Sequence, residues 1–164
     1  MFERKNIPEK DEMFMNIALF ISTQSNDPNT QVGAVIVDND NNILSVGYNS
    51  EPNGFNTIFF PWTETGNLLE TKYLYVCHAV LNAICNFTGS KKDLQGTKIY
   101  VTLFPCNECA KLIVQSGIKE VIYSCDKYAN ADSTIAAKRI FEQCGVNYRK
   151  VELEKENIKT YVKK

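Results

Sequence analysis

Two neighbouring cysteines and one histidine far from them in the chain restrict the ways in which it can fold. Cys106 and Cys109 follow Pro105 at the start of a predicted helix, and their spacing places both side chains on one helix face. His78, the sole histidine, begins another predicted helix, and a predicted strand separates it from the cysteines. If these side chains act together, the fold must bring two helix starts to one point.

The three side chains form a suitable ligand set for one zinc ion. Two thiolates and one imidazole leave the fourth tetrahedral position open, as in catalytic zinc sites. A helix N-terminus stabilises negative charge, which favours the thiolates that zinc requires. Three other interpretations stay open: a redox Cys-x-x-Cys pair, a purely structural histidine, and a structural zinc site, for which the sequence offers no obvious further ligand.

Helical and strand patterns alternate along the chain. Apolar residues at helical spacing predict helices over residues 9–22, from 78 to the Gly89-Ser90 pair, over 106–115 and over 133–144. Short apolar runs predict strands over residues 32–37, 43–48, 98–103, 121–123 and 146–153. The stretch from 49 to about 75 is irregular, and loops of this length are commonly functional. The alternation favours an α/β sandwich.

Length and charge narrow the class of protein. The 164 residues suit a single domain spanning residues 1–164, with a charged end at 154–164 that is predicted as a helix or a loose tail. The net charge of −1 gives no long-range attraction for nucleic acid. No stretch has the length of a membrane span and no cleavable signal is evident, so we expect a cytoplasmic protein without a membrane partner.

The six cysteines are expected to be reduced in such a protein. Cys85, Cys125 and Cys144 lie in apolar sequence contexts, so we predict that they are buried and behave as small hydrophobic residues. Cys77 adjoins His78, and we expect it to point away from the metal site.

Several further segments resemble deoxycytidylate (dCMP) deaminases of the zinc-dependent cytidine and deoxycytidylate deaminase family. The resemblance covers about residues 11–150 and rests on Asp27-Pro28-Asn29-Thr30-Gln31-Val32-Gly33-Ala34, Gly47-Tyr48-Asn49, Pro52-Asn53-Gly54, Tyr75-Val76-Cys77-His78-Ala79, Leu103-Phe104-Pro105-Cys106-Asn107-Glu108-Cys109-Ala110-Lys111, Gly117-Ile118-Lys119-Glu120-Val121-Ile122-Tyr123 and Asp126-Lys127-Tyr128. Such agreement is specific for the family.

The resemblance implies a cytidine-deaminase-like three-layer α/β/α sandwich with a central mixed sheet of about five strands. It implies zinc bound by His78, Cys106 and Cys109, with Asn49 and Asn29 near the bound nucleotide. The implied reaction is the zinc-dependent hydrolytic deamination of dCMP to dUMP and ammonia. The family also implies a homo-oligomer, commonly a hexamer, that dCTP activates and dTTP inhibits, often with magnesium.

One residue departs from the catalytic pattern of this family. In the H-x-E…P-C-x-x-C signature of zinc nucleobase deaminases, a glutamate two residues after the histidine carries protons. This chain has Val80 at that position. General acid–base groups typically contribute about 10² to 10⁴ in rate, so we predict severely impaired deamination. Glu108, between the cysteines, is predicted to be an exposed helix residue rather than a substitute.

A second departure follows Gly54. The family usually continues with a small residue and Ser-Asp-Asp, in a loop associated with nucleotide or effector binding. This chain continues with residues 55–60, Phe-Asn-Thr-Ile-Phe-Phe, and so lacks both acidic residues. Three hypotheses follow. The first is a dCMP deaminase in which Val80 is an engineered substitution or in which another group carries protons. The second is a catalytically silent relative that binds deoxycytidine nucleotides or associates with an active deaminase, and the third is a nucleic-acid deaminase of the editing type. The acidic balance disfavours the third, and the altered loop favours natural divergence over engineering.

Overall fold

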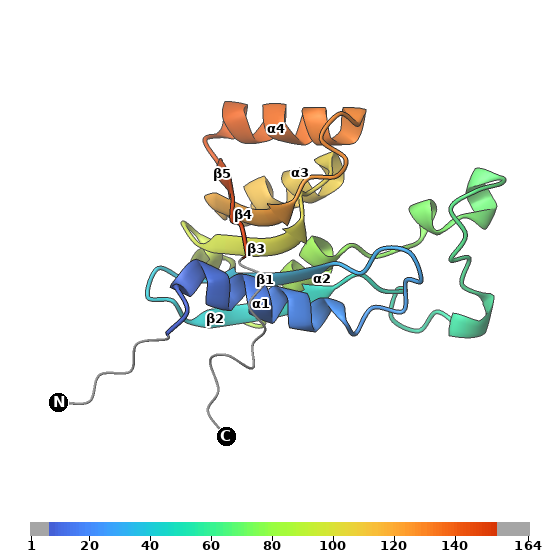
Figure 1. Cartoon of the computed structure of the whole chain (residues 1–164), viewed down its shortest axis with the longest axis horizontal. Coiled ribbons are helices and arrows are strands. Elements are labelled where there is room, and N and C mark those ends of the chain that lie inside the picture. The colour runs from blue at the N-terminus through green and yellow to red at the C-terminus, as the bar shows by residue number, and fades with distance from the viewer. Residues whose placement is uncertain (1–6, 154–164) are drawn as a thin grey trace, which may run out of the picture.

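A five-stranded mixed sheet forms the centre of the fold in the computed structural model, which describes residues 7–153 (Figure 1). The strands, in the order β2-β1-β3-β4-β5, are β1 (Gly33–Val37), β2 (Ile43–Tyr48), β3 (Lys98–Leu103), β4 (Glu120–Cys125) and β5 (Asn147–Lys150). β1 pairs antiparallel with β2 and with β3, while β3, β4 and β5 run parallel. The predicted mixed sheet of about five strands is confirmed.

Helices cover both faces of this sheet. They are α1 (Lys10–Ser22), α2 (Ala79–Cys85), α3 (Asn107–Ser116) and α4 (Asp132–Cys144). On one face, α1 forms a buried cluster with the strands through Phe14, Met15, Ala18, Val35, Val37, Tyr100 and Ile122. On the other face, α2, α3 and α4 share a second cluster that includes Val80, Ala83, Ile113, Val121 and Phe141. The predicted α/β/α sandwich is therefore confirmed.

Two glycines let helices lie directly on the sheet. A Cβ atom at Gly33 would overlap the backbone carbonyl of Ala18 in α1. A Cβ atom at Gly47 would overlap the backbone of α2 at Ala83. The close contact at Gly47 fixes the position of α2, and the start of α2 carries His78.

A long segment between β2 and α2 projects from the sandwich (green in Figure 1). We call residues 51–76 the arm; its only helical parts are three 3₁₀ turns at Thr57–Phe59, Leu68–Glu70 and Lys72–Leu74, and a bridge between Ser50 and Cys77 closes its base. Its exposed large apolar side chains are Phe55, Ile58, Phe59, Leu68, Leu69, Tyr73 and Leu74. The predicted irregular stretch is thus confirmed, and it presents an unusually apolar surface.

Three cysteines depart from the prediction. Cys85, Cys125 and Cys144 are exposed, so the expectation of buried thiols is wrong. Each is the last residue of its element, at the ends of α2, β4 and α4, where the chain leaves the sandwich. Their place at an element end decides their exposure, and the apolar residues before them in sequence do not.

The other differences between the predicted and the observed elements concern the residues at which helices and strands begin or end. α2 ends at Cys85, before the predicted Gly89-Ser90 stop, and β5 is shorter than its predicted strand. The prediction for residues 154–164 lies outside the described residues. Among residues 7–153, no helix has the length and apolar character needed to cross a membrane.

Candidate active site

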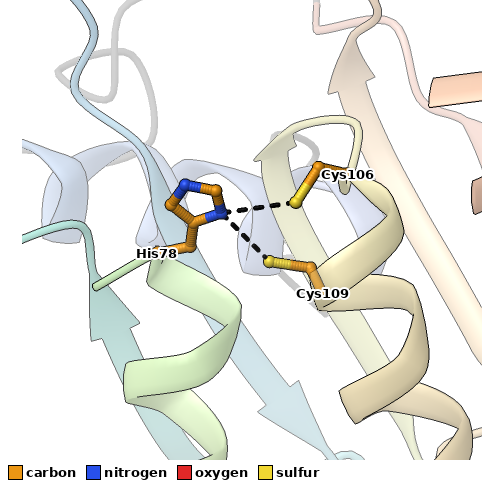
Figure 2. Close-up of side chains that lie close together, drawn as sticks. All are labelled: His78, Cys106 and Cys109. Carbon is orange, nitrogen blue, oxygen red and sulfur yellow. Dashed lines mark hydrogen bonds between the residues drawn. The ribbon is translucent and has the colours of Figure 1, made fainter. Parts of the chain in front are cut away.

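His78, Cys106 and Cys109 converge at the starts of two helices (Figure 2). His78 is the N-cap residue of α2, Cys106 is the N-cap residue of α3, and Cys109 lies in the first turn of α3. The Nδ1 atom of His78 lies 3.4 Å from the Sγ atom of each cysteine. The two helix starts meet at one point, as the sequence analysis requires of residues that act together.

The arrangement fits a tetrahedral zinc ion. An imidazole nitrogen at about 2.0–2.1 Å and a thiolate sulfur at about 2.3 Å from one tetrahedral zinc lie about 3.6 Å apart. The observed separation of 3.4 Å is close to that value. One nitrogen faces both sulfurs, and no other described His, Cys, Asp or Glu joins the cluster, so the fourth position is left to a non-protein ligand.

Protons are distributed unevenly over this cluster. The hydrogen bond from Cys109, followed by the contact with His78, lowers the pKa of Cys106 to about 4. Sharing its proton with Cys106, together with burial, raises the pKa of Cys109 well above the ordinary thiol value. The hydrogen bond to Cys106 raises the pKa of His78. A bound dication would displace these protons, since a thiol that coordinates zinc is deprotonated.

A pocket of about 360 Å³ opens beside the three side chains. Val80, only 2% exposed, lies in its wall two residues after His78. The neighbouring wall is apolar and includes Val101, Leu103 and Phe104. None of these wall residues carries a carboxylate.

Comparison with known proteins decides the family. Residues 8–125 match the sequence model of a family described as "Cytidine and deoxycytidylate deaminase zinc-binding region". The chain belongs to this family. Deoxycytidylate deaminase of Homo sapiens is 50% identical over 149 residues, which cover 90% of this chain and 83% of that protein. A probable deoxycytidylate deaminase of Drosophila melanogaster is 45% identical over 154 residues, covering 90% and 75%.

Solved structures agree with the deaminase assignment. dCMP deaminase from the cyanophage S-TIM5 in apo form aligns with a TM-score of 0.68 and 31% identity, covering 89% of this chain and 100% of that one. The same enzyme in complex with dCMP and dUMP aligns with a TM-score of 0.69 and 29% identity, covering 89% and 99%. The family, its zinc-binding domain and its fold are thus those that the sequence predicts.

Among residues 7–153, two carboxylates line the pocket, the buried Asp27 and the exposed Glu64, and both pair with the buried Lys72. Nζ of Lys72 lies 2.7 Å from Oδ2 of Asp27 and 2.7 Å from Oε1 of Glu64. Burial opposes the charge of Lys72, but the hydrogen bonds to Asp27 and Glu64 outweigh it and raise the pKa of Lys72. Both carboxylates therefore face Lys72 in this structure.

Replacing Lys72 with methionine should destabilise the protein by about 3–5 kcal/mol, because Asp27 would remain buried without its counter-charge. The free energy of unfolding, measured in urea, checks this value. Adding Asp27→Asn to the Lys72→Met variant should recover part of the loss. Equal stability of the single variant and the unmodified chain would contradict a stabilising ion cluster.

The two asparagines proposed from the resemblance lie in different surroundings. Asn49 lines the pocket, but its Oδ1 atom accepts from the backbone of Val32, and its Nδ2 atom donates to Asp27 and to the carbonyl of Thr30. Asn29 is exposed and lies outside the pocket wall. A nucleotide contact by either residue stays a prediction, and Asn49 already has a role in holding the loop after α1.

Glu108 lies away from the pocket. It is exposed, lies 2.7 Å from Nζ of Lys111, and is outside the pocket wall. The prediction of an exposed helix residue is confirmed.

The pocket also contains residues that the sequence analysis missed. Lys72 comes from the arm, and Ser133 and Thr134 come from the first turn of α4. A lysine in an irregular loop and two hydroxyl residues at a helix start carry no distinctive sequence signal. Tyr128 lies in a segment of the family resemblance, which was the one available sign of its location.

Proposed function

We propose that this chain binds zinc through His78, Cys106 and Cys109 and binds dCMP in the adjoining pocket, while its deamination of dCMP to dUMP is severely impaired. The observation that carries this proposal is the position of Val80. It lies buried in the pocket wall beside the candidate ligands, at the point where the family signature has a glutamate.

Proton transfer is the part of the reaction that this chain lacks. Bound zinc would supply Lewis acidity toward a water molecule. Two thiolates would offset both zinc charges, so proton removal would depend more strongly on a protein base than at a site with three neutral histidines. Hydrolytic deamination needs protons moved from water to the cytosine ring and to the departing ammonia, and an aliphatic side chain at position 80 can move none.

A catalytically silent binding protein is the second candidate. Val80 packs in the main core cluster, so the substitution replaces a buried carboxylate with a group that suits its surroundings. The pocket and the candidate metal ligands are intact around it. This combination supports a relative that binds deoxycytidine nucleotides or associates with an active deaminase.

The zinc-loaded protein should bind dCMP and release very little dUMP. Zinc content by elemental analysis, dCMP affinity by calorimetry and dUMP by chromatography test these statements separately. Typical enzymes turn over at about 1–10³ per second. Turnover in that range by the unmodified chain would show that another group carries protons, and failure to bind dCMP would contradict the nucleotide site.

Assembly and regulation remain predictions of the family resemblance. The exposed apolar side chains of the arm support a homo-oligomer such as a hexamer, because large apolar patches mark interaction surfaces. Control by dCTP and dTTP with Mg²⁺ has weaker support, since residues 55–58 lack the two carboxylates that the family usually has there. A cytoplasmic location is likewise proposed, with no role for nucleic acid.

A further inference from the structure

The arm takes no part in the two apolar clusters that hold the sandwich together. Its buried apolar side chain, Phe60, packs on rings of the arm itself, with its centroid 5.1 Å from that of Phe55 and 4.4 Å from that of Trp62. Within residues 7–153, the side-chain hydrogen bonds that join the arm to the rest of the chain involve two of its residues, Glu51 at its base and Lys72. The polar attachment of this projecting segment beyond its base is therefore one ammonium group (Figure 1).

Three carboxylate oxygens surround the ammonium group of Lys72. Its Nζ atom lies 3.0 Å from Oδ1 and 2.7 Å from Oδ2 of Asp27, and 2.7 Å from Oε1 of Glu64. An ammonium group has three donors, so these acceptors match all of them. Lys72 and Asp27 are both buried, and breaking a buried ion pair costs far more than breaking an exposed one. The pair therefore strongly favours one position of the arm.

Asp27 also holds the loop that follows α1. Its Oδ1 atom accepts from the backbone amides of Asn29 and Thr30, and its Oδ2 atom accepts from Nδ2 of Asn49. Thr30 and Asn49 line the pocket, as do Asp27 and Lys72 themselves. The ion pair thus joins two parts of the pocket wall that are far apart in the sequence.

We propose that Lys72 is a positioning residue of the nucleotide pocket, because its ion pair with Asp27 holds the arm where the pocket needs it to bind dCMP. This proposal rests on the proposed function and adds the residue that fixes the shape of the site. Glu64, Tyr73 and Val76 of the arm also line the pocket, so release of the arm would remove part of the wall. The apparent affinity would then fall with the fraction of molecules whose arm is in place.

The double variant Lys72→Met/Asp27→Asn tests this role without leaving a buried charge unpaired. Asparagine keeps an oxygen that can accept from the backbone amides of Asn29 and Thr30, whereas methionine has no donor for it. Hydrogen–deuterium exchange of the full zinc-loaded chain should become at least about tenfold faster in residues 51–76 and stay unchanged in β3 and β4, because a segment with few apolar contacts to the core opens locally. Calorimetry should show dCMP binding weakened by about tenfold, as expected when the arm is in place in about one molecule of ten.

A surface ion pair supplies the matched control. Lys150 lies 3.1 Å from Glu152, and both residues are exposed and outside the pocket wall. Lys150→Met therefore removes a lysine and one ion pair without touching the arm. It should leave both the exchange of residues 51–76 and the affinity for dCMP unchanged.

The outcomes distinguish a positioning role from a general one. Unchanged exchange in residues 51–76 of the double variant would overturn the proposal, and so would faster exchange over the whole chain, which indicates a general loss of stability. Faster exchange confined to the arm with unchanged dCMP affinity would also overturn it, while nucleotide binding itself stood. If the unmodified protein does not bind dCMP, the proposed function fails and the positioning role fails with it.

Discussion

Replacing Val80 with glutamate should raise the rate of dCMP deamination by at least about 10²-fold. The new carboxylate would extend from the first turn of α2 into the pocket beside the candidate metal ligands, where proton transfer is needed. The rate of dUMP formation by the zinc-loaded protein measures the effect. Val80→Gln is the matched control, because a glutamine side chain has nearly the shape of a glutamate side chain and no titratable group.

The comparison between these two variants isolates proton transfer. Equal rates for Val80→Glu and Val80→Gln would show that polarity or shape, and not proton transfer, limits the reaction. If both variants stay inactive while dCMP binds, the silent binding protein becomes the better description. Thermal unfolding should accompany the assay, because a carboxylate at this buried position carries a desolvation cost.

Replacing Cys109 with serine should weaken zinc binding by at least about 100-fold, more than the 10- to 100-fold typical of losing an outer-shell partner. Cys109 is the most buried member of the cluster. A thiol loses its proton when it binds zinc, and a serine hydroxyl does not do so readily. Zinc retained against a chromophoric chelator measures the change. Cys85→Ser, at an exposed cysteine, should leave zinc binding unchanged.

Thermal stability gives a second measure of the same site. A ligand that binds only the folded state stabilises it, so chelation should lower the unfolding temperature of the unmodified chain. The Cys109→Ser variant should show little response to the chelator. Retention of one zinc ion per chain by this variant would contradict the assignment of Cys109 as a ligand.

The sequence predicts those parts of the molecule that local patterns determine. β2 and β3 begin and end where the apolar runs do, because turn residues flank them. The convergence of His78 with Cys106 and Cys109 follows from residue type and spacing at two helix starts. Each of these features depends on a few residues, so a short stretch of sequence is enough to predict it.

Burial and pairing depend on tertiary contacts that local patterns do not record. Asp27 and Lys72 are 45 positions apart in the sequence, so neither residue alone indicates that the two form a buried ion pair. In the sequence, Thr134 is an ordinary residue of a first helical turn, and only the fold shows that it lines the pocket. Asn49 is near the predicted nucleotide position, yet its hydrogen bonds to Val32, Asp27 and Thr30 become visible only in the fold.

The arm carries exposed apolar residues and residues of the pocket wall in one continuous segment of the chain. The arm exposes Ile58 and Leu69 and supplies Lys72 and Val76 to the pocket wall, and the chain reaches His78 directly after the bridge at the arm's base. If the homo-oligomer that the family resemblance predicts forms through the arm, the neighbouring subunit would contact the same segment that lines the pocket.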